Sequence, residues 1–219
     1  MIYLSVSYQS ARLNLLTAIR AVTRAVKTEG YYARVLDRAV RDLYAGEMNE
    51  GEFIDEQIRL IEEQFRRAWN EGMRNVGLDP EKDLTDEWEM VLLEQIDKEQ
   101  EFILDYADAI IEAREAAAPI DPLRGRVDLW VNRYPEMTHL AEITCGGESR
   151  LLWRLGATEE HCNTCYTLDG TVATAEEWEA SGYHPQGAPN DKLECGGWRC
   201  DCSLEPTDEP ATEGGIPNA

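Results

Sequence analysis

The chain has 219 residues, of which 43% are hydrophobic, and a formal net charge of -22. This length and apolar content suffice for one or two domains with a buried core. No apolar run reaches the length of a membrane span, so we expect a soluble protein without membrane contacts. The acidic excess argues against a general nucleic-acid binder, because neutralising phosphates requires an excess of Lys and Arg.

Charge is distributed unevenly along the chain. Residues 1–45 contain seven Lys or Arg against three acidic residues, so the rest of the chain carries the whole acidic excess. Two interpretations of this basic segment are open. It docks on an acidic partner or on DNA, or it forms the solvated face of an amphipathic helix, which we favour. We expect any DNA contact only through this segment.

Apolar side chains recur at helical spacing in residues 10–28 and again in residues 32–43. Each stretch therefore predicts an amphipathic helix. Asn49 and Glu52 have the spacing of a capping box, in which each side chain accepts a hydrogen bond from the backbone of the other residue. This pair predicts the start of a third helix that extends to about Met73.

The longest periodic run extends from Trp88 to Ala113, and acidic residues fill most of its other face. It predicts a helix of about thirty residues, which would be about 45 Å long at 1.5 Å per residue. A helix of this length is typical of a bundle or of a brace against a partner. Asp121 followed by Pro122 predicts the N-terminal cap and first position of a further helix.

The pattern changes in the last third of the chain. Residues 151–155 alternate between the two faces expected of a strand, and the turn at residues 168–170 introduces a second short strand. Thr174 and Glu177 form another capping box, which predicts one or two helical turns. Residues 198–204 are expected to form a closing strand.

Five of the six cysteines also lie in this last third. Cys162 and Cys165 have the spacing of a zinc knuckle, in which two thiolates approach one ion from adjacent corners of a tetrahedron. We expect four cysteines to bind one structural zinc ion, namely Cys162, Cys165, Cys195 and Cys200. Cys202 is the alternative to Cys200. A thiolate-only set is typical of a closed structural site rather than a catalytic one.

Two other states of these cysteines stay open, namely disulfides and reduced free thiols. The chain begins without a basic and apolar signal sequence, so nothing indicates an oxidising compartment. Cys145 lies apart from the cluster and is expected to be a small buried apolar residue. His161 adjoins the knuckle and is expected to be a loop residue rather than a ligand.

These patterns predict a mainly α protein. We expect an N-terminal helical bundle with one long helix, followed by a small α+β cysteine-rich zinc module. The expected boundaries are a helical domain at 1–147, the cysteine-rich module at 148–205 and a disordered acidic tail at 206–219. Because the module has little apolar core of its own, metal ligation is expected to contribute much of its stability.

Several of these residues, taken in order, resemble the C-terminal module of phage head morphogenesis proteins, the family of minor head proteins related to that of phage Mu. The similarity covers about a quarter of the chain and rests on four elements: Trp153, Cys162-x-x-Cys165, Leu168-Asp169-Gly170 and Arg199-Cys200-x-Cys202-x-Leu204. The sequence departs from the family pattern where Cys195 stands in place of a histidine, with two glycines inserted before Trp198. Replacing His by Cys preserves a tetrahedral site.

The resemblance implies a virion assembly protein without enzymatic activity, located at the portal vertex or in the capsid interior and assembled in the host cytoplasm. It implies the phage portal protein as the partner, with a capsid or scaffolding protein as a further candidate.

Two other functions are open. One is a zinc-stabilised adaptor that binds proteins and has no role in a virion. The other is an endonuclease with a zinc-stabilised core, which would need a histidine as general base, and only His161 and His184 lie near enough in the sequence to serve.

Overall fold

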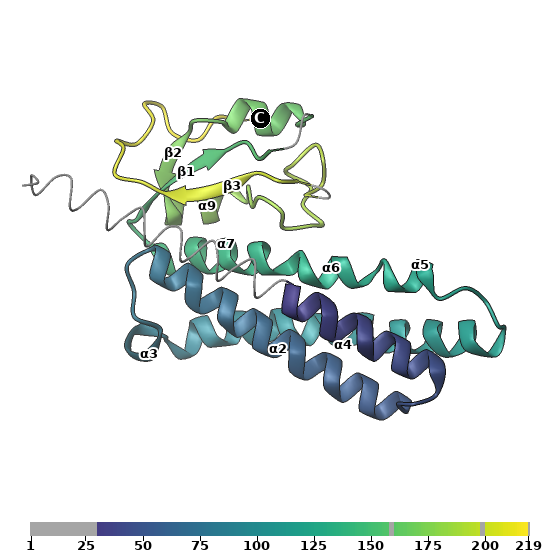
Figure 1. Cartoon of the computed structure of the whole chain (residues 1–219). Helices are drawn as coiled ribbons and strands as arrows, with labels where there is room; N and C mark the ends of the chain where they lie inside the picture. Colours follow the sequence, from purple (N-terminus) through teal and green to yellow (C-terminus); the bar gives the residue numbers. More distant parts are fainter. Residues whose placement is uncertain (1–29, 158–159, 198–199, 219) are drawn as a thin grey trace, which may run out of the picture. The chain divides into compact units, whose positions relative to one another are not determined.

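The computed structural model describes residues 30–157, 160–197 and 200–218 (Figure 1). The helix predicted over residues 10–28 lies outside these residues. The protein is mainly α, with a small three-stranded sheet and a cysteine cluster near the C-terminus that could hold a metal ion, which confirms the predicted fold class. None of the described helices is both long enough and apolar enough to cross a bilayer.

Helices occupy most of the described chain before the sheet. The first covers residues 30–45. It is followed by α2 (Glu50–Asn75), α3 (Pro80–Asp83), α4 (Asp86–Glu115), α5 (Asp121–Arg124), α6 (Val127–Val131) and α7 (Arg133–Gly146). The predicted second, third and long fourth helices are therefore confirmed, and the long one, α4, has 30 residues.

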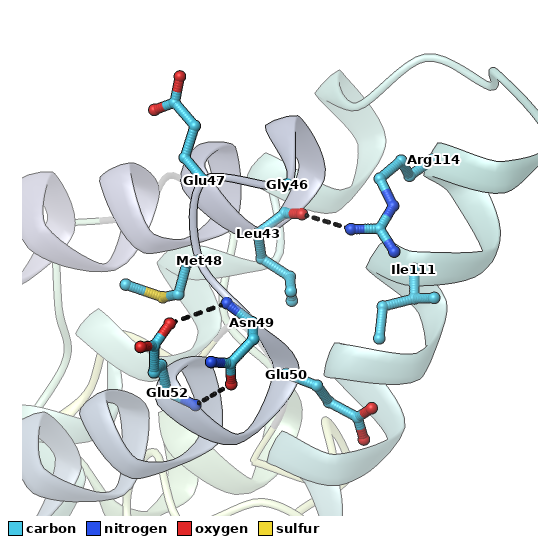
Figure 2. A pocket seen from close by; sticks show the side chains of 9 residues that line it. All are labelled: Leu43, Gly46, Glu47, Met48, Asn49, Glu50, Glu52, Ile111 and Arg114. Atoms are coloured by element: carbon cyan, nitrogen blue, oxygen red, sulfur yellow. Dashed lines mark hydrogen bonds between the residues drawn. The ribbon is translucent and has the colours of Figure 1, made fainter.

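The capping box predicted for α2 forms at its N-terminus (Figure 2). The backbone N–H of Glu52 donates to Asn49 Oδ1 at 2.9 Å, and the backbone N–H of Asn49 donates to Glu52 Oε2 at 3.0 Å. Just before it, Gly46 has a φ of 74°, a left-handed conformation that ends the preceding helix. These local interactions explain why the chain breaks and restarts a helix here.

The cap predicted at Asp121 is wrong. The N-cap of α5 is Ile120, which makes no side-chain capping hydrogen bond and already has helical angles (φ -78°, ψ -22°). The helix therefore begins one residue earlier than a carboxylate cap at Asp121 would require. Asp121 instead lies in the first turn, where its carboxylate accepts from Arg124 Nη1 at 3.3 Å.

The chain divides into two compact units. The first comprises the described residues up to Gln57 together with Ala107–Val131, and the second comprises Ile58–Tyr106 together with the chain from Asn132. Both α2 and α4 contribute residues to each unit. The domain boundaries expected at residues 147 and 205 remain predictions.

In the first unit, polar contacts link the helix over residues 30–45 to the chain that follows α4. Arg124 Nε lies 2.6 Å from Asp37 Oδ1, and the hydroxyl of Tyr44 donates to the carbonyl of Ala118 at 2.8 Å. This hydrogen bond joins residues that are 74 positions apart in the sequence and so fixes where the two segments meet.

In the second unit, α2 and α7 pack closely at Gly72. A Cβ added to this glycine would lie 2.7 Å from Ala141 Cβ and closer still to the carbonyl oxygen of Thr138. One turn further along α2, Asn75 Nδ2 donates to Glu142 Oε1 at 2.5 Å. The absence of a side chain at residue 72 therefore permits the contact, and the hydrogen bond from Asn75 satisfies one oxygen of the buried Glu142 side chain.

The sheet has the order β2-β1-β3, and all of its pairs are antiparallel (Figure 1). Its strands are β1 (Arg150–Arg154), β2 (Val172–Thr174) and β3 (Ser203–Pro206), accompanied by α8 (Asn163–Leu168) and α9 (Ala175–Ser181). The predicted first two strands and the capping box of α9 are confirmed. The predicted closing strand includes residues 198 and 199, which lie outside the described residues, and β3 begins at Ser203. The helix α9, which follows β2, packs against α7.

Two tryptophans form the centre of this part of the second unit. Trp153 and Trp178 are fully buried, with their ring centroids 5.6 Å apart. Trp178 Nε1 donates to the carbonyl of Leu151 at 3.0 Å, so its one polar atom is satisfied within the core. The aromatic pair supplies the large buried area that so short a sheet lacks.

The composition of residues 206–219 favours disorder, yet the described part of this tail lies along the sheet. The backbone N–H of Thr212 donates to the carbonyl of Val172, and the backbone N–H of Val172 donates to Thr212 Oγ1, each at 2.9 Å. Ile216 packs, partly buried, against the core of the module. Hydrogen bonds to the edge strand β2 therefore hold a segment that is poor in apolar residues.

Candidate metal centre

The first cysteine pair is positioned by the start of α8. Cys162 is the N-cap of this helix, and its Sγ accepts the backbone N–H of Cys165 at 3.4 Å. The one helical turn that follows brings Cys165 beneath Cys162, and the Cys165 side chain is 1% exposed. The Cys-x-x-Cys pair therefore lies at the N-terminus of α8, where the sulfur of Cys162 serves as the N-capping acceptor.

The loop after Leu193 positions Cys195. Gly196 and Gly197 have φ values of 63° and 79°, and the backbone N–H of Gly197 donates to Cys195 Sγ. A Cβ on Gly197 would lie 3.0 Å from backbone atoms of the loop that contains Gly187. The two glycines therefore let the chain turn back sharply and bring backbone N–H groups toward the sulfur.

The last two cysteines lie where the chain enters β3. Cys200 Sγ accepts the backbone N–H groups of Gln186 and Cys202, and Cys202 Sγ accepts the backbone N–H of Gly156. A Cβ at Gly156 would overlap the carbonyl of Asp201, so this donor can approach only because the residue is glycine. The sequence patterns did not single out Gln186 or Gly156, since their contribution comes from the backbone.

Five cysteines meet in one cluster with two overlapping triads. The sulfurs of Cys162, Cys165 and Cys195 lie within 4.8 Å of one another, and so do those of Cys165, Cys200 and Cys202. Cys165 belongs to both triads. Three of the four residues expected as zinc ligands thus form the first triad, and the fourth, Cys200, lies with the alternative Cys202 in the second. Which four of the five would bind an ion remains a prediction.

Ionisation of the five thiols is coupled because they lie so close together. Hydrogen bonds from Cys165 and Cys202 hold the pKa of the Cys200 thiol far below its usual range, and hydrogen bonds to Cys200 and Cys202 raise the pKa of Cys165. Burial raises the pKa of Cys195 to about 11. Burial also opposes ionisation of Cys162, but hydrogen bonds from Cys165 and Cys195 lower its pKa overall.

The chemistry of this donor set fits a soft divalent cation. Several thiolates cannot coexist at this separation without a positive charge to offset their repulsion, and a bound cation would supply it. Each of the sulfurs at positions 162, 195, 200 and 202 also accepts at least one backbone N–H, an arrangement that orients and stabilises thiolate ligands. The residues present therefore fit a metal bound through sulfur.

Two histidines lie near the cluster. His161 Nδ1 is 3.7 Å from Cys202 Sγ, and its ring packs edge-on against Tyr166. His184 is largely buried, which lowers its pKa, and its Nε2 has no hydrogen-bond partner among the described residues. Neither histidine belongs to a group of potential ligands in the described chain.

Cys145 lies outside the cluster in the helix α7. It is 6% exposed, as predicted for a small buried residue. Burial, reinforced by the charge of Glu179, raises the pKa of its thiol to about 12. Cys145 therefore stays protonated at neutral pH and provides an internal comparison for the clustered cysteines.

The turn at Leu168-Asp169-Gly170 joins the cysteine cluster to the sheet. Asp169 Oδ1 accepts the backbone N–H of Leu155 at 3.2 Å, and the backbone N–H of Gly170 donates to the carbonyl of Trp153 at 3.0 Å. Leu168 is fully buried, and Gly170 has a φ of 79°. Each residue of this motif therefore has a structural role within the module.

Comparison with protein-family models, with curated proteins and with solved structures finds no match. The interpretation of the cluster consequently depends on its own geometry and on the motif residues.

A separate hollow of about 530 Å³ lies in the first unit (Figure 2). Its wall combines the apolar side chains of Leu43 and Ile111 with acidic residues and Arg114. Arg114 Nη1 donates to the carbonyl of Leu43 at 3.2 Å, so the guanidinium satisfies a carbonyl near the C-terminal end of the helix over residues 30–45. The residues that line it include no cysteine or histidine, and the hollow therefore differs in kind from the cysteine cluster.

Proposed function

We propose that the protein is a virion assembly protein of a tailed phage, a minor head protein that acts at the portal vertex without catalysing a reaction. The observation that carries the proposal is the motif series that resembles head morphogenesis proteins. Trp153, the Leu168-Asp169-Gly170 turn and the cysteines belong to one small module, in which the described motif residues bury side chains, close turns or contribute sulfur; Arg199 lies outside the described residues.

We further propose that the cluster binds one structural zinc ion. The ligands are Cys162, Cys165, Cys195 and Cys200, with Cys202 as the alternative to Cys200. Support comes from the two triads that share Cys165 and from the thiolate character of the set, which suits zinc in a closed tetrahedral site. The bound ion would link three segments: α8, the loop that contains Gly196 and Gly197, and the segment that leads into β3.

Portal association is tested by co-expression with the portal protein encoded in the same phage genome. We expect the full chain to co-purify with the assembled portal ring and to be present in particles. A protein that stays monomeric beside the portal, and that is absent from particles, would refute the virion role and favour the adaptor.

A matched control separates the virion role from the metal. The variant Cys145→Ser changes a buried cysteine outside the cluster, whereas Cys165→Ser removes the sulfur that both triads share. If the module must be intact for assembly, only Cys165→Ser is expected to lose portal association. Equal loss in both variants would show that portal association does not report on the metal site.

A further inference from the structure

One side of α4 exposes apolar side chains to solvent. Met90 is 62% exposed, Leu93 is 38% exposed and Leu104 is 49% exposed. Leu92, Ile96 and Ile103 form the buried side of the same helix. At about 100° per residue the exposed residues are centred about 110° from this buried side, so they form an exposed flank of the helix beside the core stripe.

The exposed flank follows heptad spacing. Met90, Leu93 and Leu104 fall at a, d and a positions of one heptad register, and the a and d positions between Leu93 and Leu104 are occupied by Asp97 and Gln100. The seam from Met90 to Leu104 is about 21 Å long at 1.5 Å per residue. This geometry matches one side of a helix-to-helix contact of about two heptads.

The charge beside the seam has one sign. Glu94 and Glu101 are exposed at the e positions that flank it, and Asp97 lies within it. Acidic residues far outnumber the two basic residues of α4, Lys98 and Arg114. A helix docking along this seam would meet apolar side chains in line and carboxylates along one flank.

We propose that this face of α4, from Met90 to Leu104, docks a basic amphipathic helix of a partner protein. Such a helix places Leu or Ile against Met90, Leu93 and Leu104, an Arg or Lys against Asp97, and further basic residues beside Glu94 and Glu101. Charge complementarity selects the basic partner, because a neutral or acidic helix would leave these carboxylates uncompensated at the contact.

The test uses the full chain and a designed, fluorescently labelled helical peptide of three heptads. The peptide carries Leu at a and d, Lys and Arg at e and g, and one Arg at the a position that faces Asp97. We expect saturable binding by fluorescence anisotropy. Binding should weaken when salt rises from about 0.1 M to about 1 M, which shortens the Debye length from about 10 Å to about 3 Å.

Variants on the two sides of the helix make the test specific. The double variant Leu93→Ala and Leu104→Ala is expected to weaken peptide binding at least about tenfold, which corresponds to about 1.4 kcal/mol. Phe102→Ala is the matched control, because Phe102 is 52% exposed on α4 but lies about 180° from Leu93 at about 100° per residue. It should bind the peptide as the unmodified chain does.

A charge exchange provides a readout that altered folding would not produce. Asp97→Arg should weaken binding of the basic peptide and strengthen binding of a peptide with Glu at the facing position. The proposal is overturned by the absence of saturable binding, by equal binding of the seam and Phe102 variants, or by failure of the charge exchange. It is also overturned if the seam variants change the oligomeric state by sedimentation, since a second copy would then occupy the face.

Discussion

Replacing Gly72 by alanine tests whether α2 and α7 pack as closely as the structure indicates. The added Cβ would lie 2.7 Å from Ala141 Cβ and 3.2 Å from the backbone nitrogen of Glu142. Carbon atoms attract best at about 3.5–4.0 Å, so the two helices must separate by about 1 Å. Backbone atoms cannot rotate away from the new methyl group, and the strain therefore falls on the helix contact.

The expected magnitude is the difference between two opposing effects. Overpacking a well-packed site costs about 1–3 kcal/mol, and the upper part of this range applies because the neighbours include backbone atoms. Alanine in place of glycine within a helix returns about 1 kcal/mol. We therefore expect Gly72→Ala to lower the free energy of unfolding by about 2 kcal/mol.

The assay is urea unfolding followed by tryptophan fluorescence and far-UV circular dichroism, with midpoints compared at a common m value. Gly51→Ala is the matched control in the same helix. Gly51 is exposed in the first turn of α2, and its added Cβ would meet only Asn49 Oδ1, at 3.4 Å. It should raise stability by about 0.4–1 kcal/mol. A Gly72→Ala protein as stable as the unmodified chain would refute the close α2–α7 contact.

Four further predictions concern the cluster and two helices. Native mass spectrometry of protein purified without chelator should show one zinc per chain, lost in Cys165→Ser and retained in Cys145→Ser; masses of oxidised cysteine pairs would contradict the site. Chelator should release the zinc and expose the buried tryptophans of the module, seen as a red shift in fluorescence, while most of the helical circular dichroism persists. Thr174→Ala removes the α9 cap, in which Thr174 Oγ1 accepts the backbone N–H of Glu177 at 3.2 Å, and should cost about 1 kcal/mol of unfolding free energy in urea. Burial raises the pKa of Glu136 above 4.5 despite the charge of Arg133, so its protonated form stabilises the fold below that pH and this contribution is lost as pH rises through the raised pKa. The free energy of unfolding in urea should decline less with rising pH in Glu136→Gln than in the unmodified chain. The same pH dependence in both proteins would contradict the raised pKa of Glu136.

Short-range patterns in the sequence predicted most helix positions. The capping boxes at Asn49–Glu52 and Thr174–Glu177 depend on residues three apart, and both form as predicted. The helical periodicity between Trp88 and Ala113 likewise predicted α4. At Asp121 the same reasoning failed by one residue, because the preceding backbone was already helical.

The candidate site was predicted in its residues but not in its arrangement. Spacing alone identified Cys162 and Cys165 as a pair, since a turn of helix fixes their separation. That Cys165 belongs to both triads follows only from the fold, which brings residues 30 or more positions apart together. The sequence does not indicate the backbone N–H donors of Gly156 and Gln186, because residue type does not reveal which backbone N–H groups point at a sulfur.

Local sequence patterns establish the mainly α class, the starts of the two helices that have capping boxes and the identity of the clustered cysteines. These depend on local periodicity and on side-chain chemistry, both of which are encoded in neighbouring residues. The tertiary structure decided the α2–α7 contact at Gly72, the pairing of the tail with β2 through Thr212, and the sharing of Cys165. Each of these depends on which distant segments pack together, and that choice is made by the free energy of the whole fold rather than by any one stretch of chain.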